Sequence, residues 1–186
     1  MIRLLVEGFL RRENGQLLES HSTVTAVIQD DFILLVDTSS KECRSKLLNS
    51  LKNFGVKAED VDAVVLTHSH EDHTANIDLF SNAKVMMHPL ENSDIPCRSV
   101  HDGEEIFPGI RILHTPGHTA GSISVLVENE RCVITGDAIP TEDNLLKNLP
   151  PGISVDRDLA MASMQRILSI ADSVVLGHGK RIDLRV

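Results

Sequence analysis

Three histidines and two acidic residues crowd into six positions of this sequence, HSHEDH at 68–73, directly after the apolar run 64–66. Loops at strand ends commonly carry functional side chains on a rigid scaffold. An extended backbone would point His68 and His70 the same way. Packed this closely, such groups are costly unless a cation or another partner is shared among them. Imidazole and carboxylate suit zinc, with iron or manganese as alternatives. The segment therefore predicts a metal site rather than a solvated loop.

Three later segments repeat one arrangement, in which an apolar run ends in a potential ligand beside glycine. They are TPGHTAG at 115–121, ITGDA at 134–138 and VVLGHG at 174–179, and their candidate ligands are His118, Asp137 and His178. Glycine lets the backbone turn tightly and approach a ligand closely. Each segment alone is more typical of an ordinary turn. Their joint occurrence after the histidine segment indicates parts of one site.

Taken in order, these segments resemble the motifs of the metallo-β-lactamase superfamily. The resemblance starts at Asp37, after an early apolar run, and continues through HSHEDH, His118, Asp137 and His178. It covers almost the whole chain. It implies an α/β fold of the four-layer αββα sandwich type, with the metal ions at one rim.

The resemblance also implies a role for each of these positions. One divalent cation would be held by His68, His70 and His118, a second by Asp72, His73 and His178, and Asp137 would bridge the two. Asp37 would support the ligands from behind without binding a metal. Two such ions, which we expect to be zinc, can share a water and lower its pKa to give a bridging hydroxide. Asp72 would be the catalytic residue, accepting a proton from that water.

Individual positions within the motifs narrow the activity. Asp137 stands where the β-lactamases themselves typically carry cysteine, which favours the glyoxalase II, lactonase and nuclease branches. His70 stands where the flavodiiron branch has glutamate. The stretch HSHEDHTANIDLF is particularly similar to the group of metallo-β-lactamase-domain-containing protein 1. We therefore expect a metal-dependent hydrolase of a small ester, thioester or lactone. A phosphodiesterase or ribonuclease, and a mononuclear iron persulfide dioxygenase, are the alternatives.

Charge and composition bear on these alternatives. The net charge of −9 repels polyanions, and an aromatic content of 3% without Trp or Tyr offers few stacking platforms for bases. A small-molecule substrate is therefore expected, and nucleic acid is disfavoured without being excluded. The absence of tyrosine also weakens the lactonase assignment, because some lactonases use a phenol beside the metals. Lys180 and Arg181 could bind an anionic substrate group, although an ordinary solvated basic pair is the favoured interpretation.

Short β-branched runs that alternate with helix-like segments predict the scaffold that positions these residues. Strands are predicted at 2–6, 23–29, 32–36, 63–66, 85–87, 111–114, 122–127, 132–134 and 173–176. Helices are predicted at about 41–53, near 74 onward and at 156–170, with the DTSS segment at 37–40 as a helix cap. Because strands outnumber helices and several follow one another directly, two sheets covered by helices fit better than one doubly wound sheet. One domain should span residues 1–186.

Four histidines lie outside the motifs: His21, His88, His101 and His114. For His114 we favour a position at the end of a strand, with a hydrogen bond to the backbone. The alternative is that it orients a metal ligand or contacts the substrate. His21 could contact the rim of the site. His88 and His101 occur in turn contexts and are given no role.

The three cysteines, Cys43, Cys97 and Cys132, are odd in number and far apart, which predicts buried thiols of a reducing compartment. No run approaches the ~20 apolar residues that span a bilayer, and the first residues lack the order of a signal peptide. A cytoplasmic location without membrane contact is expected. The sequence leaves the oligomeric state and the native metal open.

Overall fold

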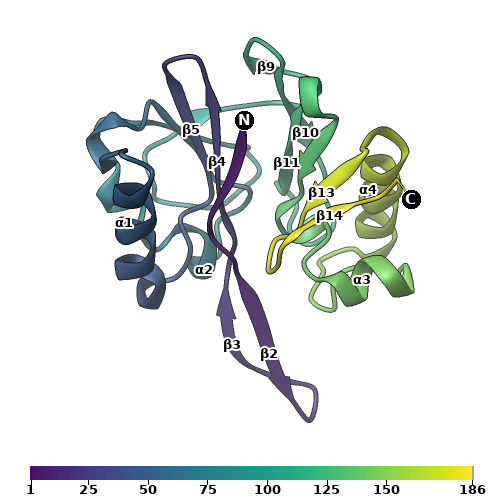
Figure 1. The fold of residues 1–186 in the computed structure, drawn as a ribbon. Coiled ribbons are helices and arrows are strands. Elements are labelled where there is room, and N and C mark those ends of the chain that lie inside the picture. The colour runs from purple at the N-terminus through teal and green to yellow at the C-terminus, as the bar shows by residue number, and fades with distance from the viewer. Residues whose placement is uncertain (186) are drawn as a thin grey trace.

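The computed structural model describes residues 1–185. Two six-stranded sheets lie face to face, and helices cover the outer face of each (Figure 1). The strand orders are β1-β4-β5-β6-β7-β8 and β14-β13-β12-β11-β10-β9. This arrangement confirms the predicted αββα sandwich.

The first half of the chain builds one sheet and its helical layer. Its strands are β1 (Ile2–Val6), β4 (Val24–Gln29), β5 (Phe32–Val36), β6 (Ala63–Val65), β7 (Lys84–Met87) and β8 (Arg98–Ser99). Pairing is antiparallel from β1 to β5 and parallel from β5 to β8. Its helical elements are η1 (Lys41–Cys43), α1 (Arg44–Asn53), η2 (Ala58–Asp60), α2 (Glu71–Thr74) and η3 (Ile77–Leu79). Leu47 and Leu51 of α1 are buried against this sheet.

The second half repeats the plan. Its strands are β9 (Glu105–Phe107), β10 (Ile110–His114), β11 (Ile123–Val127), β12 (Cys132–Ile134), β13 (Ser173–Val175) and β14 (Arg181–Asp183). Only the β12–β13 pair is parallel. The helical elements are η4 (Glu128–Glu130), η5 (Gly136–Ala138), α3 (Glu142–Lys147) and α4 (Arg157–Ile170). Met164 and Ile167 of α4 pack on the outer face of the sheet.

Apolar residues fill both faces of the central strands. Leu34 and Val36 point between the sheets and pack with Ile112 of the opposite sheet. Leu35, between them in sequence, points toward the outer face of the sheet and packs against Leu47 of α1. Strands buried on both faces carry nearly continuous apolar runs, which explains why these segments were recognisable in the sequence.

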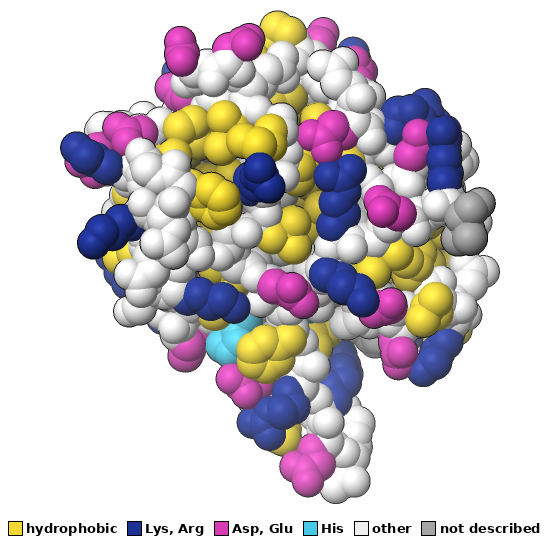
Figure 2. Space-filling view, viewed as in Figure 1, with side chains coloured by type: hydrophobic (Ala, Val, Ile, Leu, Met, Phe, Trp, Pro, Cys, Tyr) yellow, Lys and Arg dark blue, Asp and Glu magenta, His cyan; other side chains and the backbone are white. Residues whose placement is uncertain are grey.

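A separate two-stranded arm, β2 (Phe9–Glu13) and β3 (Gln16–His21), projects from one end of the sandwich (Figure 1). Its turn residues Asn14 and Gly15 have φ values of 49° and 81°, as type I′ hairpins require. Neither strand was predicted from the sequence, because each has only two apolar residues beside polar and charged ones. Figure 2 shows hydrophobic and charged side chains side by side on this arm. Its exposed apolar residues are Phe9, Leu17 and Leu18.

Three local expectations were wrong. The helix expected to begin near Thr74 is instead the four-residue α2, which ends there. The segment 37–40 does not cap the following helix, because Ser39 donates to the Ser22 carbonyl and Ser40 makes no capping bond. Only Cys132 is buried, whereas Cys97 is exposed and Cys43 lies partly covered. Strands β8, β9 and β14 and helix α3 were also not predicted.

Within residues 1–185, none of the helices combines the length and the apolar character that crossing a bilayer requires.

Candidate metal centre

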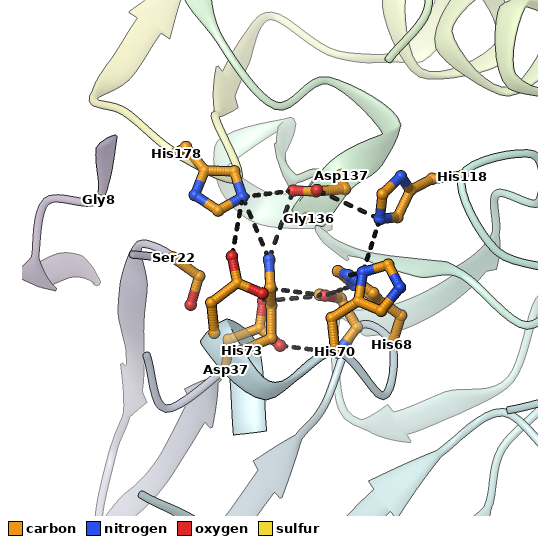
Figure 3. Close-up of polar contacts among 12 residues, drawn as sticks. Gly8, Ser22, Asp37, His68, His70, His73, His118, Gly136, Asp137 and His178 are labelled. Atoms are coloured by element: carbon orange, nitrogen blue, oxygen red, sulfur yellow. Dashed lines mark hydrogen bonds and ion pairs between the residues drawn. The ribbon is translucent and has the colours of Figure 1, made fainter. Parts of the chain in front are cut away.

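Loops that follow strands at one edge of the sandwich carry all the predicted ligands, and the fold brings them together. The loops follow β6, β10, β12 and β13. Figure 3 shows His68, His70, His73, His118, Asp137 and His178 converging on one centre. Their ligand atoms form three sets, within 4.8 Å of one another in each: His68, His70 and His118; His68, His73 and Asp137; Asp72, His73 and His178.

The first set is a tight triangle of imidazole nitrogens. Nδ1 of His70 lies 2.9 Å from Nε2 of His68 and 3.0 Å from Nε2 of His118. His68 and His118 are buried. His70 precedes α2, and its ring faces the other two. The expectation that His68 and His70 point the same way agrees with this geometry.

The second set joins α2 to the loop after β13. Nε2 of His73 lies 3.3 Å from Nε2 of His178, which in turn lies 3.8 Å from Oδ2 of Asp72. Both histidines are buried. Asp72 is less buried, and its carboxylate accepts a hydrogen bond from the hydroxyl of Ser20 on the projecting arm.

Asp137 lies between the two sets. Its Oδ1 is 3.0 Å from Nε2 of His178 and 3.4 Å from Nε2 of His73. Its Oδ2 is 3.4 Å from Nε2 of His118, in the other set. One oxygen toward each set is the geometry of a carboxylate that could bridge two ions.

Backbone and side-chain acceptors fix the orientation of these rings from behind. Nδ1 of His118 donates to the carbonyl of Ile153 at 2.7 Å, and Nδ1 of His178 donates to the carbonyl of His21 at 2.9 Å. Nδ1 of His73 donates to Oδ2 of Asp37 at 2.8 Å. A proton on Nδ1 leaves Nε2 with an unprotonated lone pair, the form that binds a metal.

The lone pairs of the candidate ligand atoms point into the middle of the cluster, where a cation could accept them. In the neutral, metal-binding form of these rings Nε2 of His73 and Nε2 of His178 are both acceptors only 3.3 Å apart, an arrangement that a cation between them would stabilise. Oδ1 of Asp137 is buried and accepts no hydrogen bond from residues 1–185. A Cβ at Gly177 would lie only 2.5 Å from that oxygen, so glycine is required for the approach. Buried acceptors without donors indicate bound cations, and the donor set fits a dinuclear metal site.

The electrostatics of the cluster differ from residue to residue. Burial, together with the neighbouring His73, lowers the pKa of His68 well below the ordinary value. Burial also opposes charge on His73, but the carboxylates of Asp37 and Asp137 outweigh it and raise the pKa of His73 well above 6.5. Burial likewise opposes charge on Asp137, but His178 and His73 outweigh it and hold the pKa of Asp137 well below 3.8. Asp137 is therefore negatively charged, as a carboxylate that bridges two cations would be.

Asp37 supports the site from behind and is not among the clustered ligand atoms. Its Oδ1 accepts the backbone N–H of Thr67 at 2.8 Å, and its Oδ2 accepts the Thr67 hydroxyl at 2.9 Å as well as Nδ1 of His73. Asp37 is buried and has a φ of 61°. One carboxylate thus holds the end of β6 and a candidate ligand together.

Sequence reasoning missed Glu91, which links two of the ligand loops. Its carboxylate accepts the backbone N–H of Ser69 at 2.8 Å and that of Gly121 at 3.0 Å, and it also accepts the hydroxyl of Thr119. Ser69 adjoins His70 in sequence, and Thr119 follows His118. An isolated glutamate before a loop carries no signal for this role.

The other histidines lie outside the ligand sets. His114 ends β10 and its Nε2 lies 3.0 Å from the carbonyl oxygen of Ala120, which agrees with the strand-end interpretation. Its ring stacks on His88 at 4.2 Å, and His101 lies beyond His88. His21 reaches the site through its backbone carbonyl, which accepts from His178.

The two basic residues after His178 are engaged in ion pairs. Lys180 lies 3.2 Å from Glu142, and Arg181 lies 2.8 Å from Glu130. These contacts agree with the favoured interpretation of an ordinary basic pair.

A small pocket of about 80 Å³ opens onto the ligand cluster. The candidate ligands that line it are His70, Asp72, His118, Asp137 and His178. Its other walls come from the projecting arm (Leu10, Arg12, Leu17 and Ser20) and from the loops at 140 and 151–153. The arm and these loops therefore decide what reaches the metal ligands.

Comparisons with known proteins agree with this architecture. The model of the metallo-beta-lactamase superfamily matches residues 18–96 and 92–179. A probable metallo-hydrolase of Methanocaldococcus jannaschii is 38% identical over 96% of this chain and 86% of its own length. Metallo-beta-lactamase domain-containing protein 1 of Xenopus laevis is 33% identical over 96% of this chain and 79% of its own.

Solved structures show the same fold. A metallo-beta-lactamase-type protein of Thermotoga maritima superposes with a TM-score of 0.79 at 23% identity, covering 98% of both chains. An N-acyl homoserine lactone hydrolase, with its product at the catalytic metal centre, superposes with a TM-score of 0.77 at 20% identity, covering 95% of this chain and 92% of its own.

Proposed function

This chain belongs to the metallo-β-lactamase superfamily and is a metal-dependent hydrolase, and we propose that it cleaves a small ester, thioester or lactone at a dinuclear zinc centre. The observation that carries the proposal is the position of Asp137, with one oxygen toward His178 and His73 and the other toward His118. A shared carboxylate between two sets of three ligands supports two ions better than one.

The shape of the pocket supports a small acyl substrate. At about 80 Å³ the pocket above the ligands admits a reacting group and excludes a folded macromolecule. Leu10, Leu17 and Ile153 give it apolar walls. The net charge of −9 disfavours a polyanionic substrate.

Two divalent cations, when bound, would polarise the scissile carbonyl and lower the pKa of a water toward neutrality. The side chains of the chain provide the rest. Asp72 lines the pocket, and its carboxylate receives the Ser20 hydroxyl. It is placed to accept a proton from the attacking water and pass it toward the leaving group. Asp37 and the carbonyl of Ile153 keep His73 and His118 in the ligating orientation.

Zinc is proposed because five imidazoles and two carboxylates form its usual nitrogen and oxygen ligand set. Iron and manganese accept the same ligands. The discriminating observation is the metal content of the purified native protein, measured together with the activity that each metal restores.

The test is a panel of thioesters, simple esters, lactones and phosphodiesters, assayed with protein of known metal content. We expect turnover of acyl substrates with two ions bound per chain, and little turnover of phosphodiesters. Preferential cleavage of phosphodiesters would replace the proposal with the phosphodiesterase alternative. A protein with a single tightly bound iron that consumes oxygen with a persulfide would replace it with the dioxygenase alternative.

A further inference from the structure

The pocket above the metal ligands adjoins a larger groove. The groove has a volume of about 540 Å³ and shares four lining residues with the pocket: Leu10, Arg12, Pro140 and Gly152. Pockets for small molecules usually measure ~300–1,000 Å³, so the groove has room for a substrate whereas the pocket has room only for the reacting group. The part of a substrate remote from the scissile bond can therefore lie in this groove.

Arg12 stands at the junction of the pocket and the groove. It projects from the arm strand β2 and lines both spaces. A Cβ built on Gly152 would lie 3.7 Å from Nη2 of Arg12, so the guanidinium lies across the backbone of the facing loop. A substrate that extends from the ligands into the groove must pass this guanidinium.

The groove has two arginines without ion-pair partners among residues 1–185. Arg12 and Arg157 both line the groove, and neither makes an ion pair with a side chain of residues 1–185. The two acidic residues of the groove do have partners: Glu142 lies 3.2 Å from Lys180, and Asp143 lies 2.7 Å from Lys147. A neighbouring arginine, Arg11, is paired with Glu19 at 3.2 Å and lines neither space. Arg12 therefore has a free guanidinium beside the reaction site.

The other side of the pocket has the opposite charge. Ser20 and Asp72 also line a second opening of about 390 Å³, whose remaining lining residues are Ser40, Lys41, Glu42 and Glu71. Three carboxylates against one lysine disfavour an anion on that side. An anionic group of a substrate is thus directed toward Arg12 and away from Glu42 and Glu71.

We propose that the substrate is an acyl compound carrying a carboxylate or phosphate group, and that Arg12 binds this group at the entrance of the groove while the scissile carbonyl lies over the metal ligands. The proposal rests on the hydrolase function proposed above. A guanidinium forms paired hydrogen bonds with either anion, which a lysine cannot reproduce. Arg12 is a specificity-determining residue in this account, and the metal ligands keep their roles without it.

The test uses zinc-loaded protein and matched thioesters, such as a succinyl thioester, its neutral methyl ester and a phosphonate of similar length. The native protein should favour the anionic thioesters about tenfold in kcat/KM. R12Q should remove this preference through KM, so that anionic and neutral thioesters are turned over alike, and should leave the metal content unchanged. R11Q is the matched control and should keep the preference. A higher affinity for the phosphonate than for the carboxylate would identify a phosphate-bearing substrate.

A binding measurement separates this inference from the proposed function. Thioether analogues, which lack the scissile carbonyl, are titrated by calorimetry into the same three proteins. The carboxylate analogue should bind about tenfold tighter than its amide in the native protein and R11Q, and equally in R12Q. If no acyl substrate is cleaved but this difference is seen, the hydrolase proposal fails and the Arg12 site stands. Equal binding in the native protein, or a preference that survives in R12Q, overturns the role of Arg12.

Discussion

Asp37 lies behind His73, on the side away from the metal centre, with Oδ2 of the carboxylate 2.8 Å from Nδ1 of the imidazole. The opposite nitrogen of His73 faces Asp137 at 3.4 Å and His178 at 3.3 Å. Asp37 thereby selects which nitrogen of His73 is free to bind a cation. The contact joins β5 to α2 and couples the geometry of the site to the fold.

Asp37→Asn should weaken the metal site without removing a ligand. The asparagine has one accepting oxygen, so its NH2 group must face a donor: either the backbone N–H of Thr67, or the Thr67 hydroxyl and Nδ1 of His73. Loss of such a supporting partner typically lowers metal affinity ~10–100-fold. Competition with a chelator measures the affinity of each ion, and it should show the lower affinity for the ion near His73 alone. If both ions bind the variant as tightly as they bind the native protein, Asp37 has no supporting role.

Asp137→Ala should reduce kcat by at least about 100-fold and lower the metal content, because it removes the carboxylate that faces both ligand sets. His114→Ala is the control, since His114 contacts the Ala120 carbonyl and no ligand set. The His114→Ala variant should bind the same amount of metal as the native protein. Metal loss in His114→Ala with full occupancy in Asp137→Ala would show that the ligand assignment is wrong.

Glu91→Gln should loosen the loops that carry His70 and His118. The substitution weakens charge-assisted hydrogen bonds from Ser69, Thr119 and Gly121, each worth ~1.5–3 kcal/mol when lost. We expect a lower melting temperature and a lower metal affinity in the same variant. Thermal denaturation with and without zinc measures both. A variant with native stability and affinity would assign Glu91 no part in the site.

Protons should compete with metal at His73. The pKa of His73 is raised well above 6.5 by the carboxylates of Asp37 and Asp137, so the metal-free chain carries a proton there at neutral pH. Binding of a cation must release it, and metal affinity should fall as pH is lowered. The folding stability of the metal-free protein should depend on pH in the opposite direction. The contribution of protonated His73 to the free energy of unfolding is complete below about pH 6.5 and is lost as pH rises through the raised pKa. Calorimetry in buffers of different ionisation enthalpy counts the protons, and zero release at pH 7 would contradict the charge state.

The residues that sequence could identify were those next to apolar strands. HSHEDH begins three residues after the last residue of β6, and His118, Asp137 and His178 stand beside glycines that close approach requires, such as Gly177. Central strands were recognisable because both of their faces are buried. The fold could therefore be predicted in outline, together with the group of residues that would meet.

The features that sequence could not provide depend on contacts between distant segments. The carbonyl of Ile153 behind His118, the carboxylate of Glu91 and the free guanidinium of Arg12 have no local pattern. The projecting arm did have one, the Asn14-Gly15 turn, which is a strong hairpin signal. The single domain, the cytoplasmic location and the small-molecule partner stay predictions.

A titration of divalent metal into stripped protein tests the central claim most directly. A chelator should abolish hydrolysis, and activity should return with added zinc, reaching its maximum near two equivalents per chain, as two ligand sets with a shared Asp137 require. Full activity in protein shown to contain no metal would contradict the account, which assigns the activation of water to cations held by these ligands and gives Asp72 only the transfer of the proton.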